Sequence, residues 1–246
     1  MKVTKITKAD LDENHYYRHS ESLYADGSIE IADNLGIVRF KGFLRAAGSI
    51  TAEAGSSIEA GSWIEAGSGI EAGTWIEAGR GIEAGSSIKA GSWIKAGDGI
   101  ESRSGIEAGS GIKAGLWIKA GLWIKAGGAI KAGSVIEAGG AIEAGEWIEA
   151  RGAIKAGEWI EARGAIKAGW GIKAGSSIKA GSSIKAGLQI SAKKTISAKL
   201  RISAGICSWR NPLPEEMTIT AQRVEGEVCY GTVKLLGTDP ASATES

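Results

Sequence analysis

The sequence predicts an all-β fold built as one solenoid, in which short strands stack turn upon turn. From Ile58 to Ile202 an isoleucine stands at every sixth position, 25 times without a break in register. The residue after it is Glu or Lys, 11 times each, or Ser in the last three repeats, and the next is Ala except at Ser102. Gly usually follows, so the unit reads Ile–Glu/Lys–Ala–Gly–x–x.

The period of six determines the kind of element. It fits neither the 3.6-residue turn of a helix nor a heptad, so no helix keeps these isoleucines on one face. Six is a multiple of two, which suits a strand with Ile and Ala facing inward and Glu or Lys facing outward. We expect the glycine to form a corner because glycine takes a positive φ without steric cost. Stacked coils then pair their backbone groups with the turns above and below.

The segments IEAGSW at 58–63 and IEAGSG at 64–69 resemble the hexapeptide repeat of left-handed parallel β-helix proteins. The similarity covers roughly 60% of the chain. In that family three hexads form one triangular coil of eighteen residues. The resemblance therefore implies about eight coils for 25 hexads and a prism about 40 Å long.

The fifth position of the unit departs from the small residue of that family. It holds large or charged side chains at Arg80, Leu116, Glu146, Glu158 and Trp170. A charged side chain there cannot point into a dry core. We therefore expect this position to lie at a corner, in contact with solvent.

The phrase GEWIEARGAIKA, written twice over residues 145–168, leaves open a flattened solenoid with twelve residues per coil. Outward charges on neighbouring rungs should alternate in sign. Eighteen residues per coil give 11 opposite-sign and 8 like-sign neighbours, whereas twelve give 10 and 10. Tryptophan placement slightly favours twelve, so the triangular coil is preferred by a small margin. Its best-alternating face would carry Glu71, Lys89, Glu107, Lys125, Glu143, Glu161 and Lys179.

The pattern divides the chain into an N-terminal segment and cap at 1–45, a hexapeptide-repeat solenoid at 46–206, and a C-terminal region at 207–246. TKADLDENHYYRH at 7–19 predicts a short helix capped by Thr7 or Asp10. Alternation begins at residue 27, so rungs that cap the solenoid are expected before the glycines become regular. MTITAQRV and VCYGTVKLL flank EGE, which predicts a terminal β-hairpin. Residues 237–246 are expected to form a frayed tail.

The residues that could support catalysis are few. Members of the resembled family are mostly acyltransferases, which place a histidine base between neighbouring subunits. Here His15 and His19 both precede the repeat, and residues 58–206 contain no insertion, so no base reaches a substrate along the prism. The two histidines could share a helix face around a metal, but no third ligand is evident.

Stacked glutamates do not change that expectation. A catalytic carboxylate pair needs two different environments, whereas repetition provides identical, exposed ones. We therefore expect no enzyme, no catalytic residue, no metal site and no cofactor, and keep a degenerate acyltransferase as an alternative.

Seven tryptophans occupy the position just before an isoleucine, which alternation directs outward. They are Trp63, Trp75, Trp93, Trp117, Trp123, Trp147 and Trp159. Exposed indoles in this number predict a contact surface for a protein partner, or for sugar rings that stack on them. The alternative is that each indole lies over a neighbouring glycine or alanine and covers the sheet.

The apolar C-terminal segment predicts a homo-oligomer, with an isologous dimer as the first expectation. The candidate contact residues are Val224, Val228, Tyr230, Val233, Leu235 and Leu236.

Composition narrows the remaining classes. A net charge of +1, from 29 basic and 28 acidic residues, gives no indication of a nucleic-acid partner. No apolar run approaches a membrane span and the first residues contain no signal core, which predicts a cytoplasmic protein without a membrane partner. Cys207 and Cys229 are too few for a disulfide framework and are expected to be free thiols.

The function that this sequence predicts is a non-enzymatic rigid rod that presents an ordered surface to a protein partner or assembles with copies of itself. Strict repetition indicates recent duplication, which is common in bacterial conflict-related proteins, including those of phages and mobile elements. An inhibitor that docks on a host enzyme is one form of this role. A carbohydrate-binding or fibre-like surface module that uses exposed tryptophans is the alternative.

Overall fold

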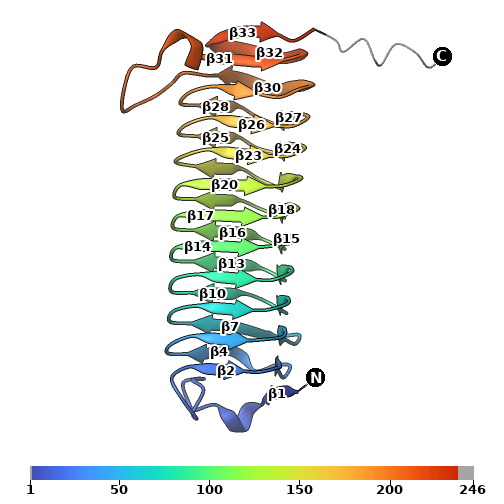
Figure 1. Cartoon of the computed structure of the whole chain (residues 1–246), viewed down its shortest axis with the longest axis vertical. Helices are drawn as coiled ribbons and strands as arrows, with labels where there is room; N and C mark the ends of the chain where they lie inside the picture. The colour runs from blue at the N-terminus through green and yellow to red at the C-terminus, as the bar shows by residue number, and fades with distance from the viewer. Residues whose placement is uncertain (1, 238–246) are drawn as a thin grey trace, which may run out of the picture.

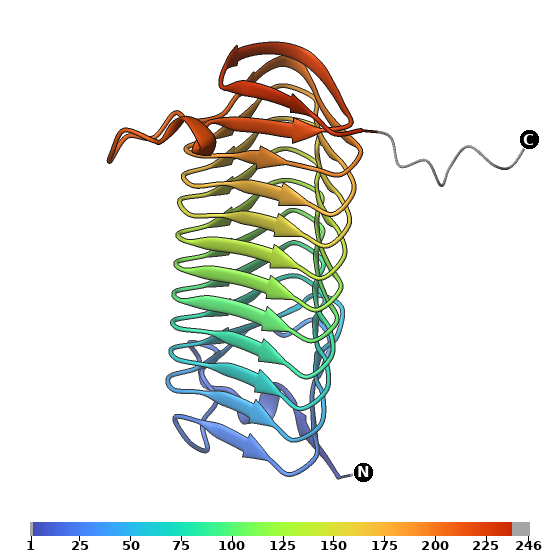
Figure 2. The same ribbon diagram turned by 45° about the horizontal axis from the view of Figure 1, so that its top comes forward.

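The computed structural model describes residues 2–237 and shows an all-β parallel solenoid of about 12 turns (Figure 1). The N-terminal and C-terminal segments lie at opposite ends of its long axis. The strands form two sheets, of 21 and 12 strands, and the named strands pair in parallel. Figure 2 shows the turns stacked in register, with the last strands forming the top of the stack.

The strands fall into three columns, one for each side of a turn. The first column contains β1 Val3–Ile6, β3 Ser28–Ile31, β6 Ile50–Ala52, β9 Ile70–Ala72, β12 Ile88–Ala90, β15 Gly105–Ala108, β18 Trp123–Ala126, β21 Ile142–Ala144, β24 Ile160–Ala162 and β27 Ile178–Ala180. The second contains β4 Gly36–Phe40, β7 Ser56–Ala60, β10 Ile76–Ala78, β13 Trp93–Ala96, β16 Gly111–Ala114, β19 Ile130–Ala132, β22 Ile148–Ala150, β25 Ile166–Ala168 and β28 Ile184–Ala186. The third contains β2 Leu23–Ala25, β5 Leu44–Ala46, β8 Ile64–Ala66, β11 Ile82–Ala84, β14 Gly99–Ser102, β17 Trp117–Ala120, β20 Val135–Ala138, β23 Ile154–Ala156, β26 Ile172–Ala174, β29 Ile190–Ser191, β31 Thr218–Ala221 and β33 Thr232–Leu235.

Two long strands, β30 Thr195–Ser203 and β32 Arg223–Tyr230, run through both the first and the second column. They join these columns into the 21-stranded sheet, while the third column forms the 12-stranded one. Two short 3₁₀ helices, η1 Lys8–Asp10 and η2 Pro214–Glu216, lie outside the columns.

The turns are about eighteen residues long through the regular repeat. Ile58 pairs with Ile76, and Ile76 pairs with Ile94. The expected eighteen-residue coil is confirmed, and the twelve-residue alternative is wrong because Ile58 would then pair with Ile70. The predicted row from Glu71 to Lys179 forms along the first column.

The core consists of the isoleucine and alanine columns. The strands show the expected alternation, with Ile buried, Glu or Lys partly or fully exposed, and Ala buried. Ile76 is 0% exposed and Ala78 is 2% exposed. Burying a side chain of the size of Ile is worth about 1.5–3 kcal/mol. The stacked core is therefore the main source of stability.

The fifth position of each unit lies at a corner, as expected. The five large or charged occupants named above are exposed, namely Arg80, Leu116, Glu146, Glu158 and Trp170, whereas Asp98 and Leu188 in the same position are half-buried.

The role expected of the repeat glycines is wrong. Among residues 2–237, positive φ angles occur at five glycines, and of these only Gly205, in the last unit, holds the corner position of the repeat. The corner glycines are needed for close approach instead. A Cβ built on Gly79 would lie 2.1 Å from the carbonyl oxygen of Gly61, one turn below. Neighbouring turns therefore stack too tightly for a side chain at such corners.

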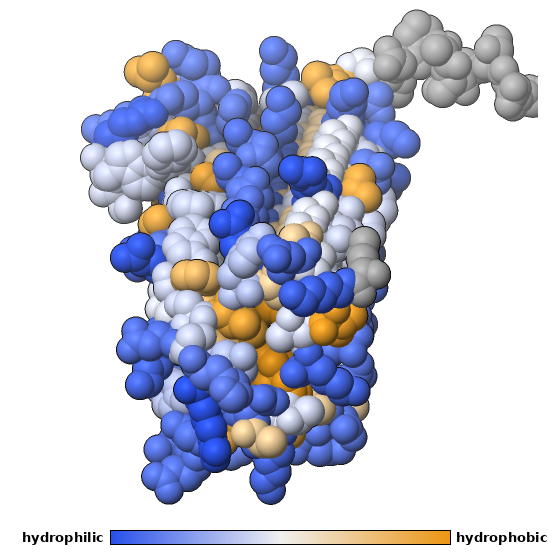
Figure 3. Space-filling model, turned by 60° about the horizontal axis from the view of Figure 1, so that its bottom comes forward, coloured by the Kyte–Doolittle hydropathy of each residue, from blue (hydrophilic) through white to orange (hydrophobic). Residues whose placement is uncertain are grey.

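The N-terminal segment covers one end of the core. The predicted helix over 7–19 is wrong beyond its first turn, since only Lys8–Asp10 is helical. The predicted cap at Thr7 is confirmed, because its N–H and hydroxyl donate to Asp10 Oδ2 at 2.8 and 2.9 Å. Leu11 is 4% exposed, and Tyr17 packs against Phe40 with ring centroids 5.5 Å apart. In Figure 3 apolar atoms are visible at the centre of this end, surrounded by polar side chains.

The predicted C-terminal hairpin is wrong. β31 pairs in parallel with β29 and β33, and β32 pairs in parallel with β30. Alternation identified the strands, but only Gln222 and Gly231 separate them, and at each the chain turns a corner of the coil instead of reversing. The parallel strand pairing thus extends from β1 to β33, beyond residues 46–206 at both ends. The solenoid therefore has about 12 turns instead of the eight expected from the 25 hexads alone. Residues 238–246, most of the expected tail, lie outside the described residues.

The segment between β30 and β31 leaves the coil and is held by an ion pair. The Arg210 guanidinium donates to both carboxylate oxygens of Glu216 at 2.6 Å, and the Leu213 N–H donates to Glu216 Oε2 at 2.8 Å. These donors, Arg210 first, lower the pKa of Glu216 to about 2. The pair therefore stays ionised at any pH at which the protein is handled.

Gly79→Ala is expected to destabilise the solenoid, because its Cβ would meet backbone 2.1 Å away. Overpacking of this kind costs about 1–3 kcal/mol of the free energy of unfolding. The matched control is Gly69→Ala, whose nearest neighbour would lie 3.4 Å away. Guanidinium denaturation measures both, and equal midpoints for the two variants would contradict the close-approach explanation.

Candidate functional site

The seven candidate tryptophans lie on all three columns and none is buried. Trp123 and Trp159 precede isoleucines of the first column, Trp75, Trp93 and Trp147 of the second, and Trp63 and Trp117 of the third. Their predicted outward position is confirmed, but they are not equally accessible. Trp93 is 46% exposed, Trp159 42% and Trp123 38%, whereas the other four are half-buried.

Four of the indoles lie over a glycine of an adjacent turn. Trp63 covers Gly81, Trp93 covers Gly111, Trp117 covers Gly99 and Trp123 covers Gly105. A Cβ built on any of these glycines would lie 2.0–2.4 Å from the indole. All four glycines are buried, whereas Gly69 and Gly171, in the same position without an indole above them, are half-buried. For these four tryptophans the covering role is therefore observed directly.

Two further tryptophans have individual surroundings. The Lys131 ammonium lies 5.6 Å from the ring centroid of Trp147, within cation–π range. Within the part of the chain that the structure describes, the Trp75 Nε1–H is buried without a hydrogen-bond partner. Both indoles thus serve local packing at least in part.

One aromatic hollow formed by two candidate tryptophans lies on the first column. Trp123 and Trp159 stand on alternate turns with Ala141 between them, and Leu122 is 51% exposed at the rim. The hollow has a volume of about 400 Å³ and also includes Glu143 and Glu158. Because Trp123 leans over Gly105, Ala141 is left half-buried as an apolar floor.

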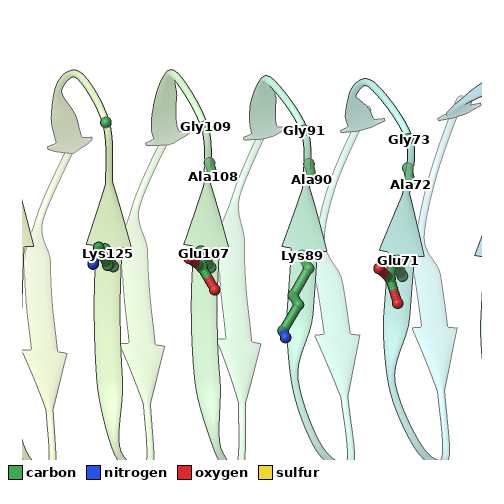
Figure 4. Close-up of a pocket in the computed structure, with 11 residues that line it drawn as sticks. Glu71, Ala72, Gly73, Lys89, Ala90, Gly91, Glu107, Ala108, Gly109 and Lys125 are labelled. Atoms are coloured by element: carbon green, nitrogen blue, oxygen red, sulfur yellow. The ribbon is translucent and has the colours of Figure 1, made fainter. Parts of the chain in front are cut away.

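A second groove of about 470 Å³ follows the first column nearer the N-terminus (Figure 4). Its walls are Glu71, Lys89, Glu107 and Lys125, one from each successive turn, above a floor of Ala and Gly. The lining contains no Ser, Cys or His that could act as a nucleophile or base. Successive turns repeat one environment, so this groove does not separate an acid from a base.

The two histidines do not form a shared site. His15 Nδ1 lies 3.0 Å from the carbonyl oxygen of Leu35, and His19 Nε2 lies 2.9 Å from Asp10 Oδ1. The Thr7 N–H, and after it the His19 ring, lower the pKa of Asp10. The proposed shared helix face does not exist, because η1 ends at Asp10. Among residues 2–237 no three His, Cys, Asp or Glu side chains are grouped to hold a metal.

The candidate oligomer contact forms the C-terminal end of the solenoid. Val224 stacks on Ile196 and Val228 on Ile202, while Val233 stacks on Ile219. These valines therefore extend the buried core columns into the last turn. Yet Val233 is 40% exposed and Leu235 is 65% exposed, because no described residue lies above them.

The rest of this end is also apolar. Tyr230 is 49% exposed and Leu236 is 38% exposed, whereas Val224 and Val228 are half-buried. The end thus exposes the side chains of an unfinished core layer.

Sequence reasoning missed several exposed apolar side chains. Leu116 (44% exposed), Leu122 and Trp170 (54%) occupy the fifth position, and Trp209 packs on Gly187 from the segment that leaves the coil. The signal was present at the fifth position, since a large apolar residue at a solvated corner has no core to enter. Cys207 and Cys229 are free, as expected.

Comparison of the chain with protein-family models, with curated proteins and with solved structures gives no significant match. Neither helix in the part that the structure describes has the length and apolar character needed to span a bilayer.

The covering role of Trp117 predicts an energetic coupling with Gly99. Gly99→Ala should destabilise the protein by about 1–3 kcal/mol, because the new Cβ would collide with the indole. In a Trp117→Ala background the same change should be nearly neutral, giving a coupling of about 1 kcal/mol or more. Denaturant unfolding of the four proteins of this cycle measures it. Strict additivity would show that the indole does not rest on Gly99.

Proposed function

We propose that the protein is a non-enzymatic, rigid β-solenoid scaffold that assembles with a second copy of itself through its C-terminal end. The observation that carries this proposal is the uncovered last core layer, above all Val233 and Leu235 at 40% and 65% exposure. In the preceding turn the corresponding residues Ile219 and Ala221 are both 0% exposed. A stack whose last layer is left open favours continuation by another layer.

The two ends of the molecule differ in how they are closed. At the N-terminal end Ile6 is 0% exposed and Leu11 is 4% exposed beneath the segment that crosses it. Unpaired strand edges, which readily recruit another strand, occur at both ends, on β1 and β2 as well as on β32 and β33, so the ends differ in the cover of their core rather than in their edges. Residues 238–246 contain no Val, Ile, Leu, Met or aromatic residue, so they offer no large apolar side chain for the last core layer.

A second copy of the chain supplies the covering layer that the C-terminal end lacks. Two C-terminal ends related by a two-fold axis present the same patch to each other, which gives a closed, isologous contact. Each copy then covers the exposed leucines and valines of the other with matching apolar side chains. The product is a longer rod whose two N-terminal ends point outward.

Leu235→Glu is expected to convert the dimer into a monomer, because it places a charge in the apolar contact without a partner. Size-exclusion chromatography with light scattering measures the mass. The matched control is Leu122→Glu, which changes a leucine of 51% exposure far from the end and should leave the dimer intact. A monomeric wild-type chain at micromolar concentration would remove the self-assembly proposal.

The proposal also covers the handedness and the cross-section of the solenoid. We infer a left-handed coil of triangular section, like that of the hexapeptide-repeat proteins that the sequence resembles. Three strands per turn, each from one six-residue unit, support three equal sides. An experimental structure with a right-handed coil, or with two long sides per turn, would contradict this inference.

A second candidate function is partner binding through the exposed tryptophans, favoured by the hollow between Trp123 and Trp159. A protein partner or a sugar ring could stack there, with Glu143 and Glu158 as hydrogen-bond acceptors. A protein ligand would suit the inhibitor role predicted from the repeat. A sugar ligand would suit a surface module.

Iodide quenching of tryptophan emission tests whether this surface is available. The Trp123→Ala/Trp159→Ala variant should lose more of the quencher-accessible emission than the matched Trp63→Ala/Trp117→Ala variant. The reason is that the first pair is exposed and the second half-buried. Uniformly blue-shifted, quencher-protected emission in the wild-type protein would exclude the exposed binding surface.

A further inference from the structure

The net charge of +1 conceals a strong separation of charge along the rod. Residues 50–86 contain six acidic residues and one basic residue. Residues 162–214 contain ten Lys or Arg and no Asp or Glu. In the solenoid this second stretch lies directly below the last turn, which β31, β32 and β33 form, so its positive charges are concentrated within about 15 Å along the axis.

Six of these cations gather at one corner, between the first and second columns. This basic edge consists of Arg163, Lys167, Lys179, Lys185, Lys199 and Arg201, which are all exposed. Arg163 follows β24 and takes the corner position that glycine holds in most turns. Lys199 takes the corresponding corner two turns later, within β30, and Lys167 and Lys185 point outward from the adjoining strands β25 and β28.

The basic edge is poorly neutralised by the protein itself. Lys167 Nζ lies 3.7 Å from Glu149, and Lys179 Nζ lies 2.8 Å from Glu161. The other four cations form no ion pair with any described residue. Of the two glutamates one turn above, Glu225 pairs with Arg223 at 2.7 Å, whereas Glu227 stands in register with Arg201 and is the acidic residue opposite the edge on that side.

The same region contains like-charge neighbours across the ladder. Lys167 pairs in register with Lys185, and on the third column Lys155 pairs with Lys173. Like charges directly opposite each other destabilise a sheet. The row from Glu71 to Glu143 alternates in sign, which shows that this repeat can avoid such neighbours.

We propose that the basic edge binds the phosphate backbone of a nucleic-acid duplex. A duplex carries one negative charge per about 1.7 Å of its axis, a density that matches an edge of closely spaced cations without acidic residues between them. An acidic protein surface would have to keep many unpaired carboxylates adjacent. The apolar part of the edge is Leu200, 60% exposed between Lys199 and Arg201, and one leucine is too small for the apolar centre that protein interfaces use. The nucleic acid is therefore the better match.

The geometry also determines the kind of binding. The basic edge has no helix or protruding loop that could enter a groove and contact base edges. Phosphate contacts position a protein but carry no direct sequence information. Binding is therefore independent of sequence and strongly dependent on salt. It does not require the C-terminal contact between copies, and the Leu235→Glu variant should bind a duplex as well per chain.

Fluorescence anisotropy with a labelled DNA duplex of about 20 base pairs tests the proposal. With four to six phosphate contacts, the dissociation constant should lie in about the micromolar range at 50 mM NaCl and rise roughly 150- to 1,800-fold by 200 mM. The Arg163→Glu/Lys185→Glu variant should bind about a hundred-fold more weakly. It should remain folded, because Glu at 185 would oppose Lys167 with the opposite charge.

The matched control is Arg103→Glu/Lys113→Glu, which changes the net charge equally but lies outside the basic edge. It should bind within about threefold of wild type. Equal weakening by the two variants would overturn the assignment to this edge. Absence of binding at 50 mM NaCl, or equally tight binding of poly-glutamate, would overturn the nucleic-acid proposal.

Discussion

Each isoleucine of the repeat lies above and below another isoleucine because the chain completes a turn every eighteen residues. This register pairs the backbone of Ile58 with that of Ile76 and the backbone of Ile76 with that of Ile94. It also places Ala over Ala and brings the corner glycines within contact of the carbonyl oxygens one turn below. A shift of one residue would turn every isoleucine outward, so the whole rod depends on this spacing. The same spacing also orders the surface, because the outward charges and the indoles stack in rows along the rod.

A stack of turns has two ends, and this molecule closes only one of them among its described residues. The N-terminal segment places Leu11 and Tyr17 against the first turns. The last turn leaves Val233 and Leu235 without a cover. The sides of the rod carry aromatic and charged surfaces instead. Four of the seven candidate tryptophans already cover glycines, and the charges alternate near the middle but separate toward the C-terminal end. The rod therefore presents an apolar end, an aromatic hollow and a basic edge as distinct surfaces.

The strict hexad made most of the fold predictable from the sequence. Ile76, Glu77 and Ala78 face the sides that alternation predicts, and the charge rows favoured eighteen residues per turn over twelve. The sequence could not reveal strand direction at the C-terminus, because TITA and TVKL alternate in the same way in a hairpin and in a coil. The N-terminal helix prediction failed because the capping residues at Thr7 and Asp10 can close a single turn without a helix following.

The site was less predictable than the fold, because it depends on distances between turns. The sequence placed Trp63 and Trp159 in the same position, yet Trp63 covers Gly81 and Trp159 is 42% exposed. Whether an indole finds a glycine to cover depends on the residue eighteen places away, which becomes a neighbour only once the register is known. The basic edge was hidden for the same reason, since an overall charge count does not show which lysines share a corner.

Small-angle X-ray scattering of the wild-type protein in solution tests the assembly most directly. One chain of 12 turns is about 58 Å long at the spacing between neighbouring strands. Assembly through the C-terminal ends predicts a particle of about 115 Å with the cross-section of a single rod. A dimer no longer than about 60 Å with a doubled cross-section, or a particle with the mass of one chain, would contradict it.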